Sequence, residues 1–397
     1  MYSLITYFKS VSMIHRTLTS ELLTLVDEYP VVTILGPRQS GKTTLARATF
    51  PDCAYTNLES PEEREWASDD PKAYLAQFPS RVIIDEIQRV PELLSYIQVI
   101  VDEAGLNGQF ILTGSHQLQL REAIGQSLAG RTAILNLLPF SIEELANAGI
   151  SYDSFEQYAY RGFLPRIYDK KLRPTVAWSN YYQTYVERDV RQLVNLRDAT
   201  LFEKLLKLVA GRVGQLVDFS SLANDVGVDA KTIRNWISIL EASFILFKLP
   251  PYFENFGKRA IKAPKYYFTD VGLLCFLLGI RKPEQVTRDP LVGSIFENLV
   301  VIEFLKTRYN RGTMADLYFF RDSNGNEVDL LAPDGSSLVA IEIKSASTFS
   351  ARLLKGLSRF QAITQRPTTP VLIYNGEPRM LGNDIQALPF DQVNRVL

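Results

Sequence analysis

The segment at residues 31–44 constrains the fold of this chain more than any other feature. It reads Val-Val-Thr-Ile-Leu-Gly-Pro-Arg-Gln-Ser-Gly-Lys-Thr-Thr, an apolar strand that runs into the complete pattern G-x-x-x-x-G-K-[ST]. Gly36 and Gly41 allow the backbone to turn tightly, so that successive N–H groups point inward at a triphosphate. A helix opens at Thr44, and its N-terminal dipole also favours an anion. The order strand, loop and helix therefore predicts a phosphate-binding loop.

The side chains of this loop have distinct expected roles. The ammonium of Lys42 is expected to lie against the outer phosphates of ATP, and the Thr43 hydroxyl is expected to ligate Mg²⁺. Arg38 is a further candidate for a phosphate contact. ATP and Mg²⁺ are thus the expected cofactors, and the predicted binding residues of the loop are Gly36, Pro37, Arg38, Gln39, Ser40, Gly41, Lys42, Thr43 and Thr44.

Two acids end a second predicted strand, which covers residues 81–86. Asp85 is expected to hold the shell of Mg²⁺, and Glu86 is expected to polarise the attacking water as a general base. The exposed end of an acidic strand is the alternative interpretation, but the phosphate loop upstream disfavours it. Lys42, Asp85 and Glu86 are therefore the predicted catalytic residues of an ATP hydrolase.

Three polar residues further along the chain have two interpretations each. Thr113 and Ser115 end a strand predicted over 109–115, where a hydroxyl either senses the terminal phosphate or belongs to a generic turn. Arg131 either completes the charge around the phosphates or pairs with a surface acid. Ser115 and Arg131 are carried forward as candidate nucleotide-binding residues.

Length and charge bound the class of protein. The chain has 397 residues, which suggests two or three domains, and its formal net charge is −1. Any binding of nucleic acid must therefore come from local basic patches. Two distant cysteines, Cys53 and Cys275, fit a reducing compartment, so a cytoplasmic location is expected. The longest near-apolar run, residues 272–280, is too short to span a bilayer, so no membrane partner is expected.

The order of predicted elements divides the chain into three parts. Strands that alternate with helices predict an α/β domain at residues 14–150, with a three-layer parallel sheet typical of P-loop NTPases. Residues 151–285 are predicted to form a helical and winged-helix domain. Residues 286–397 are predicted to form a small α/β domain. Met13 is also expected to be the true start, with residues 1–12 as a misassigned extension.

A helix, a glycine turn at Gly227 and a second helix are predicted over residues 222–241, followed by the two strands of a wing at 244–249 and 265–269. This winged-helix region either grips nucleic-acid phosphates or serves only as a lid on the ATPase. The basic residues that favour the first alternative are Lys231 and Arg234 on the second helix and Lys258, Arg259, Lys262 and Lys265 in the expected wing.

Together these motifs resemble a known family. The segments Gly36-Pro-Arg-Gln-Ser-Gly-Lys-Thr-Thr-Leu, Ile84-Asp-Glu-Ile-Gln, Leu112-Thr-Gly-Ser and Leu128-Ala-Gly-Arg resemble the prokaryotic AAA-type ATPases with a C-terminal domain of unknown function, DUF4143. The resemblance extends from Ile14 to about Lys344, and members are similar to archaeal and signal-transduction ATPases. Many relatives have a Gly-Gly-Phe-Pro turn where this chain has Arg161-Gly-Phe-Leu-Pro. Any role tied to that turn is therefore open here.

Charged residues of the C-terminal part form a second motif. Glu342 and Lys344 lie two apart on an apolar strand and share one face, and a hairpin is expected to place Asp329 opposite Glu342. Two carboxylates and a lysine at a strand edge predict a Mg²⁺ site, with Glu297 from a helix as the fourth group. This arrangement resembles the PD-(D/E)xK nuclease fold, which is either active or retained as an inactive scaffold.

The sequence thus predicts an ATP-hydrolysing switch or motor coupled to a nuclease-like C-terminal domain that acts on DNA or RNA. The alternative is a regulatory ATPase whose C-terminal domain is an inactive interaction module. A homo-oligomer, in which Arg131 reaches a neighbouring subunit, and an unknown protein partner both stay open.

Overall fold

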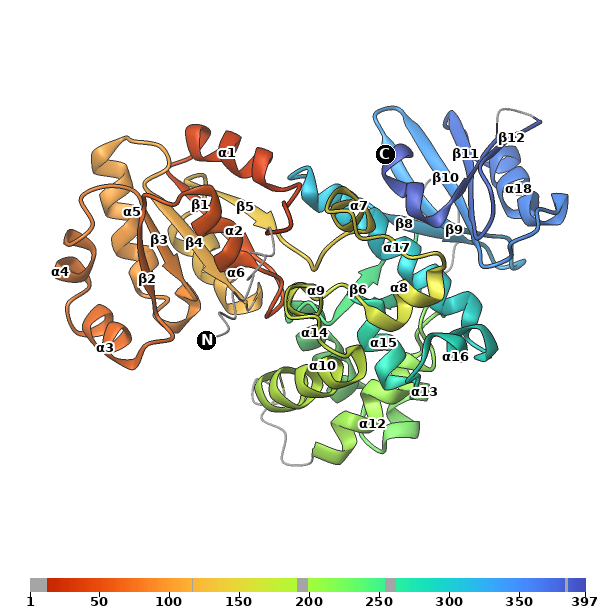
Figure 1. Ribbon diagram of the computed structural model, residues 1–397, viewed down its shortest axis with the longest axis horizontal. Helices are drawn as coiled ribbons and strands as arrows, with labels where there is room; N and C mark the ends of the chain where they lie inside the picture. The colour runs from red at the N-terminus through yellow and green to blue at the C-terminus, as the bar shows by residue number, and fades with distance from the viewer. Residues whose placement is uncertain (1–12, 116, 191–198, 254–261, 383–384) are drawn as a thin grey trace, which may run out of the picture.

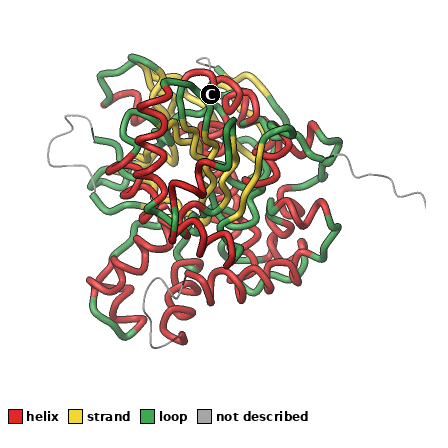
Figure 2. Tube along the Cα trace, turned by 90° about the vertical axis from the view of Figure 1, so that its left-hand side faces the viewer, coloured by secondary structure: helices red, strands yellow, loops and turns green. Residues whose placement is uncertain are grey.

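A computed structural model describes residues 13–115, 117–190, 199–253, 262–382 and 385–397 of the chain. It contains a five-stranded sheet near the N-terminus, a helical middle region and a six-stranded sheet near the C-terminus (Figure 1). Figure 2 shows the same arrangement from the side, with helices surrounding both groups of strands. Two predictions concern residues outside the described part of the chain: the extension at residues 1–12, and Lys258 and Arg259 of the expected wing.

The first sheet is parallel, with the order β2-β3-β4-β1-β5. Apolar side chains fill β1, β3 and β4 because both faces of this sheet are covered by helices, as the continuous hydrophobic runs predict. The predicted P-loop NTPase fold class is thereby confirmed. The strands are β1 Val31–Leu35, β2 Ala54–Asn57, β3 Val82–Asp85, β4 Phe110–Gly114 and β5 Thr132–Asn136.

Helices cover this sheet on two sides. One group packs through a core with Leu22, Leu45 and Ile83, and the other through a larger core that continues into the rest of the molecule. The helices are α1 Thr19–Glu28, α2 Lys42–Thr49, α3 Pro61–Asp69, α4 Pro71–Ala76, α5 Leu93–Ala104 and α6 Gln117–Ser127, with a 3-10 turn at Ile87–Arg89.

The middle region is helical, as predicted. Its helices are α7 Ile142–Asn147, α8 Phe155–Arg161, α9 Pro165–Asp169, α10 Pro174–Tyr181, a π-helix at Tyr182–Val190, α12 Ala199–Ala210, α13 Phe219–Val226, α14 Ala230–Ala242, α15 Val271–Leu277 and α16 Pro283–Arg288. Gly227 adopts φ +97° between α13 and α14, which only glycine tolerates readily. The strands β6 Leu246–Leu249 and β7 Lys265–Phe268 form an antiparallel pair.

One basic residue assigned to the wing has a different environment. Lys265 is buried on β7 and bound by two carboxylates, so it is not available to grip a phosphate backbone. Its prediction as part of a basic nucleic-acid patch is wrong. The signal was in the sequence, because Lys265 opens the apolar run Lys265-Tyr-Tyr-Phe.

The C-terminal sheet is mixed, with the order β12-β13-β11-β10-β9-β8. Helix α17 (Val292–Asn310) packs on one face with Ile341 and Ile343, and helix α18 (Lys355–Ile363) packs on the other with Ala340. The strands are β8 Tyr318–Arg321, β9 Glu327–Asp334, β10 Ser337–Lys344, β11 Thr368–Tyr374, β12 Arg379–Leu381 and β13 Ile385–Pro389, with 3-10 turns at Ala351–Leu354 and Phe390–Arg395.

Helix α17 lies in the middle of the molecule, between the helical region and the C-terminal sheet (Figure 1). Twelve of its side chains are buried, including the charged Glu303 and Lys306, so it is a core helix and not a surface one. Across the described residues, the longest apolar stretch of any helix falls short of what a bilayer crossing requires.

Candidate functional site

The first sheet brings the phosphate loop and the predicted acids to one edge. Strand β4 lies between β1 and β3, and Leu35 pairs with Gly114 at the carboxyl ends of β1 and β4. In a parallel sheet all strands end at the same edge, so the loop after β1 meets Asp85 and Glu86 after β3. Ser115, directly after β4, lies between them.

Both glycines of the loop are required for close approach or for an unusual backbone. A Cβ on Gly36 would lie 2.1 Å from the carbonyl oxygen of Leu137, so only glycine lets the loop pack against the end of β5. Gly41 has φ +94° and opens helix α2. The Lys42 ammonium donates to the carbonyls of Gly36 and Pro37, at 3.0 and 2.9 Å, and burial lowers its pKa.

Asp85 is the centre of a hydroxyl cluster. The Thr43 hydroxyl lies 2.9 Å from each carboxylate oxygen of Asp85, and Thr113 also donates to Asp85. Tyr55 donates to the same carboxylate at 3.2 Å, and burial together with Asp85 raises the pKa of Tyr55 to about 12. Hydroxyl and carboxylate oxygens beside a lysine form the donor set that Mg²⁺ and a polyphosphate require, so the residues fit both groups.

Glu86 is held in a strained and oriented conformation. Its φ is +57°, a left-handed value that is uncommon outside glycine. Ser115 donates to its carboxylate at 3.0 Å, and the Gln88 amide donates to the same oxygen. Gln39 in the loop has φ +63°, so two neighbouring pocket residues carry backbone strain. Such strain gathers at functional sites.

A cavity of about 830 Å³ opens between this edge and the helical region. Its lining includes Arg38, Lys42, Thr43, Asp85 and Glu86. The lining also includes residues that the sequence did not suggest, and these come from the segment before α1, from the loop after β5, from the segment after α7 and from α9: His15, Arg16, Phe140, Ile150, Pro165, Arg166, Tyr168 and Asp169.

The turn that departs from many relatives positions α9 at this cavity. Gly162 has φ +66°, and a Cβ there would lie 2.4 Å from both Trp178 and Asp270, so the position tolerates only glycine. Asp270 accepts a hydrogen bond from the Phe163 amide at 2.9 Å. Burial raises the pKa of Asp270 to about 6. The turn Arg161-Gly-Phe-Leu-Pro therefore keeps its glycine and its proline in structural roles next to the pocket.

Arg131 does not reach the pocket of its own chain. It precedes β5, and its carbonyl accepts from Val31 at the start of β1, whereas the phosphate loop follows the end of β1. Five residues of strand separate these edges by roughly 16 Å. The Arg131 guanidinium forms a bidentate pair with Asp102, at 2.6 and 2.8 Å. The prediction that it contacts phosphates within its own chain is wrong, and the surface-acid alternative holds.

The C-terminal charges form a second cluster, and three of the four predicted residues meet there. The Lys344 ammonium lies 2.8 Å from both Asp329 and Glu342. Burial and the neighbouring Asp329 raise the pKa of Glu342 to about 8, and its Oε2 atom is buried with no hydrogen-bond partner. Glu297 instead pairs with Lys265 at 3.1 Å and also accepts from Tyr267 at 2.5 Å.

The carboxylates of this cluster do not converge on a common point. In the described part of the chain, no group of three or more His, Cys, Asp or Glu side chains is placed to hold a metal ion. Lys265 and Glu327 were not predicted as members of the cluster. In the present conformation, therefore, the residues do not fit a Mg²⁺ site.

Comparison with known proteins agrees with these features. Residues 28–146 match the family model of the AAA domain, and residues 292–393 match a domain of unknown function, DUF4143. The chain therefore combines segments that match the AAA domain and DUF4143. The resemblance seen in the sequence is thereby confirmed. Residues 152–284, between the AAA and DUF4143 domains, match another domain of unknown function, DUF8612.

Similar proteins occur in other organisms. An uncharacterized protein of Mycobacterium tuberculosis is 29% identical over 384 residues, which are 95% of this chain and 84% of that protein. An uncharacterized protein of Haemophilus influenzae is 25% identical and covers 84% of this chain and 87% of its own length. A solved Walker-type ATPase of Pyrococcus abyssi has 15% identity and a TM-score of 0.41, over 66% of this chain and 94% of its own.

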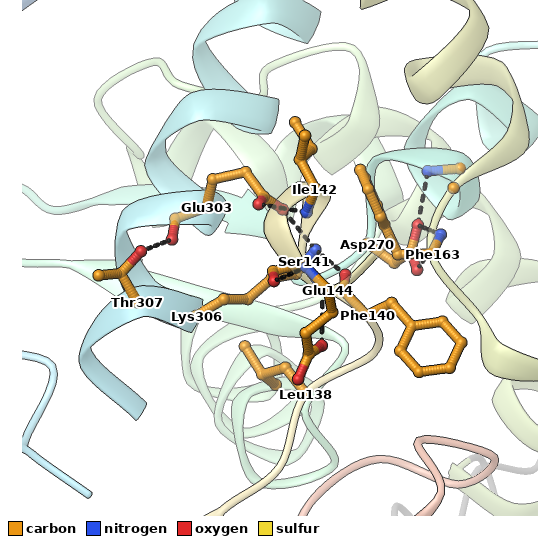
Figure 3. A network of polar contacts seen from close by, with 12 residues as sticks. Leu138, Phe140, Ser141, Ile142, Glu144, Phe163, Asp270, Glu303, Lys306 and Thr307 are labelled. Atoms are coloured by element: carbon orange, nitrogen blue, oxygen red, sulfur yellow. Dashed lines mark hydrogen bonds and ion pairs between the residues drawn. The ribbon is translucent and has the colours of Figure 1, made fainter. Parts of the chain in front are cut away.

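The AAA and DUF4143 domains are joined by a buried polar network on helix α17 (Figure 3). Glu303 accepts from the amide of Ile142 at 2.8 Å, and Lys306 donates to the carbonyl of Phe140 at 2.7 Å. The two side chains also pair with each other at 2.7 Å. Phe140 belongs to the loop after β5 and lines the cavity, and Ile142 is the first residue of α7.

The same loop is connected to the phosphate loop through Arg16. This buried guanidinium donates to the carbonyls of Ser40 and Leu138, at 2.7 and 2.6 Å. It also pairs with Glu144 at 3.0 Å, and Glu144 caps α7 together with Ser141. A continuous chain of contacts thus runs from Ser40 in the phosphate loop to α17 in DUF4143.

Lys306→Met is expected to destabilise the protein by about 3–5 kcal/mol, because it leaves the Glu303 carboxylate buried without its cation. Urea unfolding at pH 7 measures the effect, with exposed Lys355→Met as the matched control. Since burial raises the pKa of Glu303, the double variant Glu303→Gln/Lys306→Met should recover part of the loss. If Lys306→Met unfolds at the same urea midpoint as the wild type, the result contradicts a buried ion pair here.

Proposed function

We propose that this AAA protein binds ATP with Mg²⁺, hydrolyses it and acts as a molecular switch. One observation carries the proposal: the Thr43 hydroxyl contacts the Asp85 carboxylate at one edge of the sheet. Lys42 and Glu86 line the same cavity, and Ser115 orients the Glu86 carboxylate. The AAA fold independently supports ATP use. The glycines and the lysine of the loop supply the remaining contacts to a triphosphate.

Each residue has a role that follows from its position. The ammonium of Lys42 is desolvated and points into the loop, where it donates to two loop carbonyls. When ATP binds, it exchanges these hydrogen bonds for bonds to phosphate oxygens. Bound Mg²⁺ supplies neutralisation of the charge on the phosphates. Glu86 accepts a proton from the attacking water, and Ser115 and Gln88 hold its carboxylate in place for that transfer.

The switch requires contacts that differ between nucleotide states. Arg16 is the candidate sensor, because it binds the carbonyl of Ser40 inside the phosphate loop and also Glu144 beyond the sheet. Closure of the loop on a triphosphate moves the Ser40 carbonyl, and the rigid network passes this displacement to α17. Phosphate release measured with Mg²⁺ and with EDTA, each with and without DNA and RNA, tests the proposal. Absence of Mg²⁺-dependent turnover under all conditions contradicts it.

One candidate for the C-terminal domain is a nuclease-like module coupled to this switch, with DNA or RNA as its substrate. The order of helix Glu297, strand Asp329 and strand Glu342-x-Lys344 supports it, as does the convergence of Lys344 on two carboxylates. The second candidate is a regulatory ATPase whose C-terminal domain is a catalytically inactive interaction module. The pairing of these carboxylates with lysines favours the second candidate.

Asp329→Ala separates these two candidates. If the domain is an active nuclease, the wild type with Mg²⁺ or Mn²⁺ cleaves DNA or RNA, and Asp329→Ala does not. The exposed Asp334→Ala on the same strand is the matched control and should keep wild-type cleavage. Gel electrophoresis of labelled substrates, with and without ATP, measures the difference. If neither protein cuts any substrate, the inactive module is the better account.

A further inference from the structure

Lys265 is a nearly fully buried lysine placed between two carboxylates of different elements. It is 3% exposed, and its ammonium lies 3.1 Å from Glu297 on α17 and 2.6 Å from Glu327 on β9. The Lys265 ammonium also lies over the ring of Phe319, 5.3 Å from the ring centroid. A buried ammonium is costly unless it is paired and hydrogen-bonded, so this position holds a cation only because both acids are present.

The backbone fixes this cation in place. Lys265 pairs with Leu249 on the neighbouring strand β6 and forms a bridge with Leu216 on its other side. Three residues further on, Phe268 exchanges two hydrogen bonds with the side chain of Asn298, at 2.8 and 2.9 Å. Strand β7 of the helical region is therefore locked to helix α17, and the lysine enters the cluster at a set register.

Every acid of the cluster already has a lysine partner, and two lysines are shared among the four carboxylates. Lys265 forms ion pairs with Glu297 and Glu327, and Lys344 forms ion pairs with Asp329 and Glu342. A Mg²⁺ ion needs about six oxygens at roughly 2.1 Å, whereas an ammonium holds oxygens at hydrogen-bond distance and repels a second cation. Of the acids predicted to hold a metal, Glu297 pairs with Lys265 instead, and Asp329 and Glu342 pair with Lys344.

We propose that the ammonium of Lys265 is a built-in cation of the C-terminal carboxylate cluster, which the helical region supplies in place of a divalent metal. The inference does not depend on ATP hydrolysis. Removing this charge leaves no ammonium between Glu297 and Glu327, while Glu327 keeps its ion pair with Arg321 and Asp329 keeps Lys344. The variant cluster then takes a hard divalent cation, and the wild-type cluster does not.

Manganese binding by the full-length chain without nucleotide tests the proposal. Electron paramagnetic resonance counts free Mn²⁺, and the thermal unfolding midpoint reports any stabilisation by the bound ion. Lys265→Met is expected to bind one Mn²⁺ more per chain than the wild type. The cluster of the variant should bind this ion at least about 100-fold more tightly than the wild-type cluster does, because a repelling charge within a few ångströms is gone. Lys265→Gln serves as a second variant that keeps a hydrogen-bond donor.

The controls locate the bound ion. Lys248→Met, on the exposed side of β6, leaves the phosphate loop and the cluster intact and should gain no Mn²⁺. Adding Asp329→Asn to Lys265→Met should abolish the gained site. The proposal is overturned if either folded Lys265 variant binds no additional Mn²⁺. It is also overturned if the wild type already binds Mn²⁺ at a site that Asp329→Asn removes, a measurement that needs no Lys265 variant.

Discussion

Glu86→Gln is expected to lower the turnover of ATP by about 10²- to 10⁴-fold, the usual contribution of a positioned general base. The substitution keeps the shape of the side chain, and it preserves a group to which Ser115 can donate. It removes the carboxylate that accepts the proton from water. Because Lys42, Thr43 and Asp85 are untouched, ATP affinity should change little. Phosphate release under saturating ATP and isothermal titration calorimetry measure the two quantities separately.

Glu62→Gln is the matched control for this experiment, since Glu62 is exposed in the first turn of α3 and does not line the cavity. It should leave both turnover and affinity at wild-type values. Undiminished turnover in Glu86→Gln would remove Glu86 from the mechanism. A parallel loss of affinity would instead show that the strained backbone at Glu86, with φ +57°, depends on the carboxylate.

Lys42→Ala is expected to weaken ATP binding at least about 100-fold, because charge-assisted hydrogen bonds to phosphate contribute about 1.5–3 kcal/mol each. Before nucleotide binds, this ammonium holds the carbonyls of Gly36 and Pro37 together, so the variant also loses the internal brace of the loop. Calorimetry with a nonhydrolysable ATP analogue measures the affinity. The exposed Lys72→Ala is the control, and an unchanged affinity in Lys42→Ala would contradict the assignment of the loop.

The meeting of the phosphate loop with Asp85 and Glu86 at one edge of the sheet was predictable because these motifs are local in sequence. The phosphate loop, Asp85 and Glu86 each follow a short buried strand, and parallel strands bring such ends to one edge. Arg131 shows the limit of motif matching. It precedes its strand, so the same rule places it at the opposite edge, and the sequence order contained that signal.

The residues that complete the cavity were not predictable from local patterns. Arg16 contacts the Leu138 carbonyl and the Glu144 carboxylate, both more than a hundred residues away, and no spacing rule connects it to either. Lys265 was grouped with basic neighbours, and only its place at the start of the apolar run Lys265-Tyr-Tyr-Phe indicated burial. Its two partners lie on elements that follow it by 32 and 62 positions, so the pairing depends on tertiary packing alone.

Helix α17 has a consequence for how such chains diversify. By sequence it opens the DUF4143 segment, yet its Glu303 and Lys306 complete the hydrogen bonds of Ile142 and Phe140. Glu297 lies six residues before Glu303 and nine before Lys306, roughly 9 to 14 Å along the helix, and belongs to the carboxylate cluster. Recombination just ahead of α17 would therefore replace one side of the buried interface between the two domains. A transplanted C-terminal domain must then carry an acid and a lysine three residues apart on its first helix to satisfy these backbone groups.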